Sequence, residues 1–179
     1  MKKLFIFTIV IVQLLGCSSP KTQGTQSSNP YSQYIRYYNK ADIDSIIQHN
    51  DYTIIFGWTE WCRGGHNQLK EYLIPFLKEK RDNIGVISIC CANPNKLVDF
   101  VEQNDCKHPI YLLSGSWSGL DKWRLNRRFH AIFDNYQSVN YVPIAILCDN
   151  QKQILNWDAV NKVYHGLGSS ILQIKNNNY

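Results

Sequence analysis

Short, nearly continuous apolar runs recur along the chain, and between them bulky apolar residues repeat at helical spacing. A run of this kind is typical of a strand that is buried on both faces of a sheet. We therefore predict strands over 52–58, 84–91, 109–113, 142–148 and 153–157, with a hairpin turn between the last two. The helical spacing predicts helices from 39 or 42 to 49, from the turn after residue 62 to 77, from 94 to about 101, from 120 to about 136, and from 158 onward.

Strands and helices alternate along most of this pattern, which indicates right-handed βαβ units and a mainly parallel sheet flanked by helices. The closing hairpin adds an antiparallel edge to that sheet. Pro75 interrupts the second helical pattern and is expected to kink it or to start a new helical piece. In an α/β sheet the functional site forms at the carboxyl ends of the strands, which draws attention to the turn after the first long strand.

That turn reads W-T-E-W-C-R-G-G-H over residues 58–66. Its cysteine, Cys62, lies between a strand and a helix, where backbone N–H groups and the helix dipole favour a thiolate. A thiolate in that place is a nucleophile or a redox centre. The second cysteine of a C-x-x-C pair would fall at position 65, which is glycine. His66, one turn along, is expected to lie either beside the thiolate or exposed on the first turn.

From about residue 42 to the C-terminus, the sequence resembles the thioredoxin-like superfamily. The apolar strand and W-x-x-W-C are similar to the family's active-site entry, and Y-V-P-I at 141–144 is similar to its later proline turn. Residues 107–140 resemble the strand and helix inserted in membrane-tethered periplasmic thioredoxins and in peroxiredoxins. The resemblance implies a thioredoxin-like α/β fold, a cis peptide bond before Pro143, and Cys62 as the attacking thiol. It also implies a substrate site that includes Trp61, Arg63, Val142 and Pro143.

Gly65 departs from the family pattern, because a disulfide oxidoreductase needs a second thiol to resolve its mixed disulfide. One interpretation is that Cys62 acts alone, as in monothiol family members, and that external thiols resolve it. A second is that Cys90 or Cys91 replaces the missing thiol, although strand alternation lets only one of them approach and both read equally as small buried apolar residues. A third is that the site is redox-inactive and the aromatic groove around it binds a partner.

A peroxidase is a weaker alternative. Thr59-x-x-Cys62 resembles the T-x-x-C of peroxiredoxins, in which a later arginine orients the peroxide, but Ile55 stands where that motif has proline. Three clustered arginines offer a guanidinium group, and nothing in their spacing selects one: Arg124, Arg127 and Arg128.

The first residues read as an export signal rather than as part of the fold. Lys2 and Lys3 precede the apolar residues 4–12, which are too few to span a bilayer as a helix. The L-L-G-C that follows resembles a bacterial lipobox, so we predict a signal peptide over 1–16 and lipidation of Cys17. Residues 17–30 are polar and predict a flexible tether, which leaves 31–179 as one thioredoxin-like domain. The predicted location is the bacterial cell envelope, lipid-anchored and facing the periplasm or the outer surface.

Charge and cysteine content narrow the expected partners. The formal net charge is +5, but the basic residues are dispersed apart from one cluster, Lys122, Arg124, Arg127 and Arg128. Nucleic acid is a poor partner for an exported lipoprotein. The cluster reads as a solvated helix face, with an anionic ligand or partner as the alternative. Five cysteines follow Cys17, and an exported chain meets an oxidising compartment in which thiols tend to pair. Because five is an odd number, at least one of them lacks a partner within the chain. We expect exported proteins or small-molecule thiols as partners and neither a metal nor a cofactor, since no C-x-x-C pair supports zinc.

Overall fold

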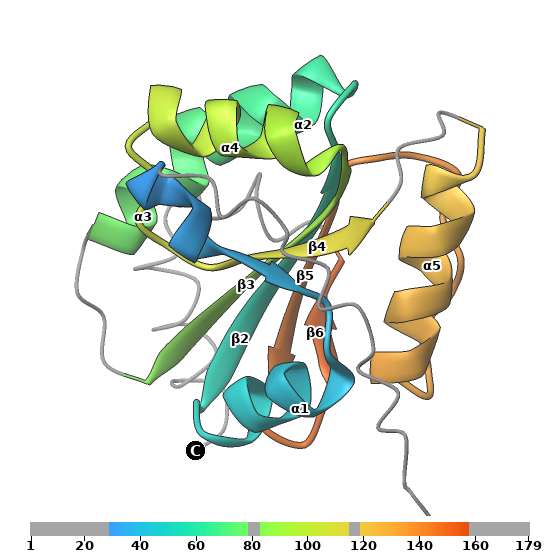
Figure 1. The fold of residues 1–179 in the computed structure, drawn as a ribbon. Coiled ribbons are helices and arrows are strands. Elements are labelled where there is room, and N and C mark those ends of the chain that lie inside the picture. Colours follow the sequence, from blue (N-terminus) through green and yellow to red (C-terminus); the bar gives the residue numbers. More distant parts are fainter. Residues whose placement is uncertain (1–28, 79–82, 115–118, 158–179) are drawn as a thin grey trace, which may run out of the picture.

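The computed structural model describes residues 29–78, 83–114 and 119–157, which form a six-stranded sheet flanked by helices (Figure 1). The strand order is β1-β4-β3-β2-β5-β6. The first four of these run parallel to one another, and β5 and β6 form an antiparallel edge. The strands are β1 (Ile35–Tyr37), β2 (Tyr52–Thr59), β3 (Ile84–Ala92), β4 (Ile110–Ser114), β5 (Ile144–Asp149) and β6 (Ile154–Asn156).

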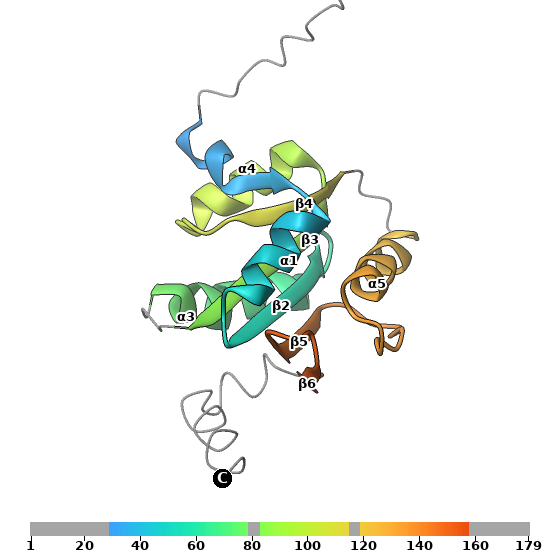
Figure 2. The same cartoon turned by 90° about the horizontal axis from the view of Figure 1, so that it is seen from below.

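Helices cover both faces of this sheet (Figures 1 and 2). One face packs against α1 (Lys40–Gln48) and α5 (Asp121–Ile132). The other packs against α2 (Arg63–Gln68), the π-helical turn η2 (Leu69–Leu73), α3 (Ile74–Lys78) and α4 (Pro94–Gln103). The strands alternate as their pleat requires: Ile54 belongs to the core beneath α2 to α4, and Ile55 belongs to the core beneath α1 and α5.

The centre of the sheet, β2, places the site. Its residues 53–59 are all buried, which explains the continuous apolar run in the sequence. Near its carboxyl end Trp58 pairs with Cys90 of β3, and on the other side Gly57 pairs with Ile144, the first residue of β5. A Cβ atom at Gly57 would lie 2.7 Å from the Phe129 ring, so glycine at this position lets α5 pack directly on the strand.

This topology is a thioredoxin-like fold, as the sequence predicted. The β4–α5 segment is inserted before the proline turn, and the Val142–Pro143 peptide bond is cis. Asn39 and Asn93 cap α1 and α4 with their side chains, each accepting a hydrogen bond from the backbone N–H two residues ahead. Because Ile144 pairs with Gly57, the start of β5, directly after Pro143, lies beside the end of β2.

Several elements differ from the sequence prediction. Residues 35–37 form β1, which was not predicted; this short strand exists through its pairing with β4, with Ile35 opposite Ile110. It follows a 3₁₀ turn, η1 (Pro30–Tyr34), whose first residue was assigned to the tether. The expected interruption at Pro75 takes the form of the π turn η2 just before it, since proline has no N–H to continue the α-helical pattern.

The helix predicted over 120–136 ends earlier, at Ile132. Phe133 adopts an extended conformation, and the chain folds back along α5 because the Asn126 side chain binds it. The Asn126 amide accepts hydrogen bonds from the Tyr136 hydroxyl and the Val139 N–H, both at 2.8 Å, and donates one to the Val139 carbonyl at 3.0 Å. The predicted signal peptide over 1–16, Cys17 and the predicted last helix from Asp158 lie outside the described residues.

Candidate active site around Cys62

Cys62 lies in the turn that connects β2 to α2, and it caps that helix. Its backbone N–H donates to the Thr59 carbonyl at 3.1 Å, which closes the turn after the strand. Its side chain accepts a hydrogen bond from the Gly65 N–H, with 3.4 Å between nitrogen and sulfur. The residue is partly exposed, whereas the other cysteines of the described domain are buried.

The proline turn approaches the same sulfur from the β5 side. The Cys62 thiol donates to the Val142 carbonyl, with 3.5 Å between sulfur and oxygen. Val142 and Pro143 are both partly buried, and together they wall one side of the turn. The sulfur thus has an N–H donor on one side and a carbonyl acceptor for its proton on the other. When the proton leaves, the Gly65 N–H remains as a donor to the anion.

Position 65 retains the geometry of a C-x-x-C pair without its second thiol. An ideal Cβ atom built at Gly65 lies 3.7 Å from the Cys62 Cβ. Disulfides have Cβ–Cβ separations of about 3.5–4.5 Å. The same Cβ atom lies 3.2 Å from the Trp58 Cβ, so a side chain there requires a shift of a few tenths of an ångström. The chain therefore departs from the family pattern by lacking the second sulfur, while the backbone at position 65 still fits a disulfide.

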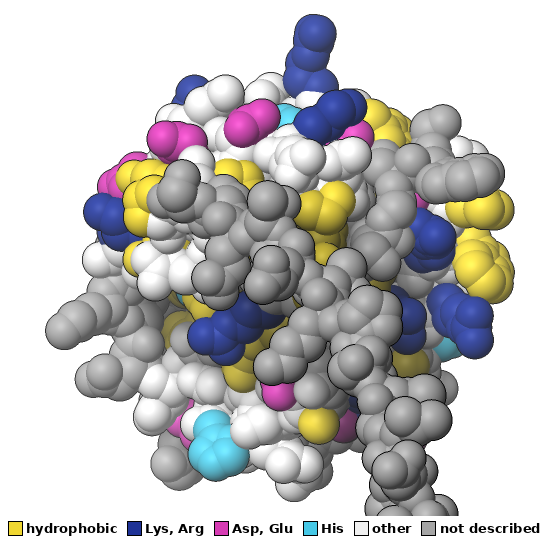
Figure 3. All heavy atoms as spheres, viewed as in Figure 1, with side chains coloured by type: hydrophobic (Ala, Val, Ile, Leu, Met, Phe, Trp, Pro, Cys, Tyr) yellow, Lys and Arg dark blue, Asp and Glu magenta, His cyan; other side chains and the backbone are white. Residues whose placement is uncertain are grey.

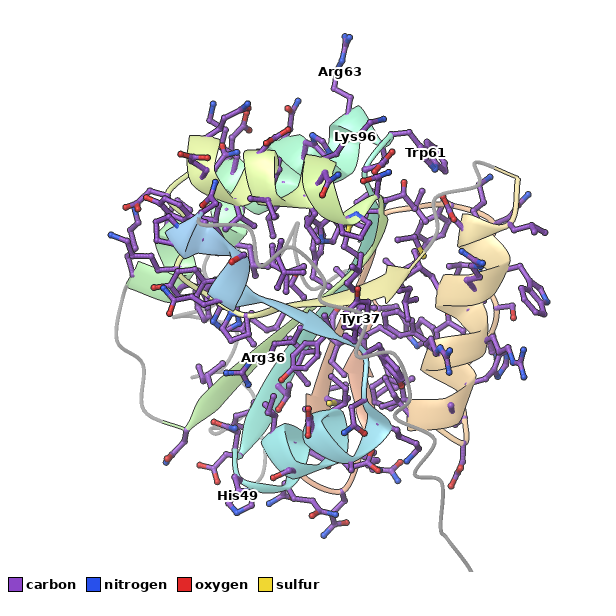
Figure 4. The ribbon with its side chains drawn as sticks, in the orientation of Figure 1. Arg36, Tyr37, His49, Trp61, Arg63 and Lys96 are labelled. Atoms are coloured by element: carbon purple, nitrogen blue, oxygen red, sulfur yellow. The ribbon has the colours of Figure 1, made fainter. Side chains whose placement is uncertain are left out.

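Trp61 and Arg63 flank the cysteine and behave differently. Trp61 is 43% exposed, and its indole N–H donates to a carboxylate oxygen of Asp121 at 2.9 Å. Asp121 is fully buried at the start of α5, so it anchors the tryptophan from beneath while the ring faces solvent. Sequence reasoning missed this residue, because only the fold brings α5 beside the turn. Arg63 is exposed and points away from the domain (Figure 4), so no contact supports its predicted place in the substrate site.

His66 fits neither of its two expected roles. Its ring is partly buried and packs between Trp58, with centroids 5.1 Å apart, and Phe100, with centroids 4.8 Å apart. Burial lowers its pKa, and a hydrogen bond to the Glu60 backbone opposes that shift. His66 Nε2 is buried and has no hydrogen-bond partner within the described residues. The imidazole is therefore a packing group on the α4 side of the turn.

The two cysteines considered as resolving thiols are buried. Cys90 belongs to the core beneath α4 and Cys91 to the core beneath α5, so their side chains do point to opposite faces as predicted. Burial raises the pKa of the Cys90 thiol well above its usual value, and burial with the nearby Asp121 charge raises that of Cys91 to about 12. The Cys91 sulfur lies 3.8 Å from the Asp121 carbonyl. Cys90 and Cys91 are both free thiols. A resolving role for either has no support in this arrangement.

The residues of the peroxidase alternative are only partly brought together. Thr59 is fully buried at the end of β2, and its hydroxyl has no hydrogen-bond partner in the part of the chain that the structure describes. The three clustered arginines line a separate cavity along α5, which neither Thr59 nor Cys62 lines.

Comparison with models of known protein families gives no match, and no curated protein matches the sequence. Among solved structures, the chain is similar to a thioredoxin-related protein from Neisseria meningitidis serogroup B, with 16% identity and a TM-score of 0.45, over 65% of this chain and 87% of that one. It is similar to StoA from Bacillus subtilis, with 20% identity and a TM-score of 0.45, over 60% of this chain and 72% of that one. The thioredoxin domain of a thiol-disulfide oxidoreductase from Bacteroides vulgatus gives 12% identity and a TM-score of 0.47, over 64% and 73%. At such identities the similarity concerns the fold alone.

Proposed function

We propose that this protein is a monothiol thioredoxin-like redox protein that acts through Cys62 on exported proteins or small-molecule thiols. One observation carries the proposal: Cys62 is a partly exposed residue, and its sulfur lies between the Gly65 N–H and the Val142 carbonyl. A fixed donor aimed at a reachable sulfur stabilises the anion that attacks a disulfide. Gly65 removes the internal resolving thiol, so the resolving thiol comes from outside the chain.

The proposed reaction is stepwise thiol–disulfide exchange. The Cys62 thiolate attacks one sulfur of a substrate disulfide; the substrate S–S bond breaks, and its other sulfur leaves as a thiolate. A small-molecule thiolate then attacks the Cys62 sulfur and releases the second substrate sulfur. A second small-molecule thiolate attacks the small-molecule sulfur of the remaining mixed disulfide and frees Cys62. The substrate gains two electrons and two protons, and two small-molecule thiols are oxidised to one disulfide.

Exposed aromatic side chains beside the sulfur suit an extended polypeptide substrate. Trp61 is 43% exposed and Tyr141 is 53% exposed, and they belong to the two turns that meet at Cys62. Aromatic residues of this kind contribute strongly to protein contacts, because they bury a large area with few rotatable bonds. The same observation favours the second candidate function, a redox-inactive module that binds a partner across this groove.

A trapping experiment separates the two functions. Cells expressing the wild type are quenched in acid, alkylated and analysed without reductant; we expect higher-mass species that collapse on reduction. Cys62→Ser is expected to lose them, and Cys148→Ala, which removes a fully buried thiol, is expected to keep them. If Cys62→Ser gives the same species as the wild type, the role of Cys62 is wrong. If no such species form and wild type and Cys62→Ser co-purify with the same partner, the binding module is correct.

We also propose that the chain is an exported lipoprotein attached to the bacterial cell envelope through Cys17. The support comes from the sequence, where a basic pair, an apolar run and L-L-G-C follow one another. Separately, none of the helices within the described ranges is long and apolar enough to cross a membrane. Labelling cells with a radioactive fatty acid is expected to mark the wild type and not Cys17→Ala. Equal labelling of both would overturn this assignment.

A further inference from the structure

A second concave site lies along α5, away from Cys62. Its volume is about 400 Å³, within the range of small-molecule sites, and it lies between α5 and the ends of β1 and β4. Basic and hydrophobic side chains gather over α5 on this part of the surface (Figure 3). The lining residues come from three segments: Tyr37 and Tyr38, Leu112 and Leu113, and Trp123 with Arg124, Arg127 and Arg128.

Two of the arginines lie over aromatic rings. The guanidinium of Arg128 lies 4.8 Å from the Tyr38 ring centroid, and that of Arg127 lies 5.4 Å from the Trp123 ring. A guanidinium over a ring is attracted by the negative face of the ring, and this attraction does not use up its N–H donors. Within the described ranges neither Arg127 nor Arg128 forms an ion pair. Both guanidinium groups are thus available to an anion.

Tyr38, which lines the same cavity, carries a polar group without a partner. The backbone of Tyr38 is fixed by a hydrogen bond from its N–H to the Leu112 carbonyl at 3.0 Å. Its hydroxyl oxygen is buried and has no hydrogen-bond partner among the residues that the structure describes. Such groups are nearly always paired in folded proteins, so a polar ligand atom that reaches this hydroxyl from the cavity would satisfy it. The described lining contains no acidic residue, so the local charge favours an anion.

We propose that this cavity binds a small aryl anion, meaning a flat apolar ring that carries a phosphate or carboxylate group. Arg127 and Arg128 would contact the anionic group, because planar guanidinium forks match phosphate and carboxylate oxygens. Trp123, Tyr37 and the two leucines supply apolar walls for the ring. The proposal does not depend on Cys62, which does not line the cavity.

Calorimetric titration of the purified full-length protein with phenyl phosphate tests this site. We expect saturable binding to the wild type and at least about tenfold weaker binding to Arg127→Gln/Arg128→Gln, since each lost charged hydrogen bond has about that effect. The matched control is Lys70→Gln/Lys78→Gln, which removes the same charge from exposed positions outside this cavity. Thermal melts confirm that both variants are folded.

Two further arms define the ligand class. Tyr38→Phe is expected to weaken phenyl phosphate binding several-fold while leaving the ring stack with Arg128 in place. Inorganic phosphate and benzyl alcohol are each expected to bind much more weakly than phenyl phosphate, because each lacks one half of the ligand. Unchanged affinity in the arginine variant, or equal affinity for inorganic phosphate, overturns the proposal. So does arginine-dependent binding to phosphatidylglycerol vesicles with no binding of phenyl phosphate, which would assign the arginines to a membrane surface.

Discussion

Two regions of the same sheet hold cysteines under opposite conditions. At the turn after β2, Cys62 is partly exposed, and its sulfur has both a hydrogen-bond donor and an acceptor. The other four thiols of the described domain are buried, and the pKa of each is raised. The pKa is about 12 for Cys91 and Cys148, well above the usual value for Cys90, and above the usual value for Cys106. Burial is the largest cause in each case.

The difference shows that position in the fold decides which thiol can react. A buried thiol is kept protonated because its anion cannot be solvated, and a protonated thiol is a poor nucleophile. Cys91 makes the contrast sharpest, since its neighbour across the strand pair is Thr59, three residues before Cys62. The pairing of β2 with β3 therefore brings a buried thiol next to the turn that holds the accessible one.

Alkylation should give the largest contrast. In the native protein we expect iodoacetamide to modify Cys62 at least ~10³-fold faster than any buried cysteine, because the latter react only when the structure opens. Peptide mass spectrometry along a time course measures each site, with the Cys62→Ser protein as the blank. Modification of Cys91 at the rate of Cys62 would break the comparison, since it would mean that the end of β3 opens readily.

Replacing cysteine by serine should lower the stability of the protein much more at the buried Cys90 than at the partly exposed Cys62. Cys90→Ser places a hydroxyl without a partner in the core beneath α4 and should lower the free energy of unfolding by about 2–3 kcal/mol. Cys62→Ser should change it by less than about 0.5 kcal/mol, because serine is a favoured N-cap and the site is partly exposed. Urea unfolding followed by circular dichroism measures both. Equal losses would show that Cys62 is as much a core residue as Cys90.

The accessible region was the more predictable of the two from sequence. The strand, the Cys62 turn and the proline turn follow from local patterns, and their meeting follows from the fold class. The Trp61–Asp121 hydrogen bond and the inward turn of His66 depend on α5 and α4 packing against the turn from distant parts of the chain. No local spacing encodes those contacts.

Long-range packing also explains the missed elements. Strand β1 is three residues long and depends on pairing with β4. Leu125, Phe129, Phe133 and Tyr136 continue a helical apolar spacing beyond the true end of α5, because the chain that folds back still packs its apolar side chains on the same core.

Adding the missing thiol tests whether the turn retains disulfide geometry. Gly65→Cys should form an intramolecular disulfide with Cys62, because the Cβ positions lie 3.7 Å apart. The oxidised variant should be more stable than the reduced one by about 2 kcal/mol, the value expected for closing so short a loop. Non-reducing mass mapping and melts with and without dithiothreitol measure both effects. If both thiols of the folded variant stay free under oxidising conditions, the geometry argument for position 65 is wrong.

The protonation of two partly buried histidines, His66 and His108, should give the smallest of the expected effects, a change in stability with pH. Burial lowers the pKa of His66 beside the Cys62 turn and that of His108, whose Nε2 contacts the Val86 carbonyl at 3.0 Å. Below the unfolded value of about 6.5 the unfolded chain takes up protons that the folded imidazoles do not, so these groups make the protein less stable as the pH falls from about 7 to 5. His66→Phe keeps an aromatic ring between Trp58 and Phe100 and removes one of the titrating groups. Urea unfolding at both pH values should show a smaller loss of stability in this variant than in the wild type. A steeper loss would mean that His66 is charged in the folded protein and acts on the Cys62 turn after all.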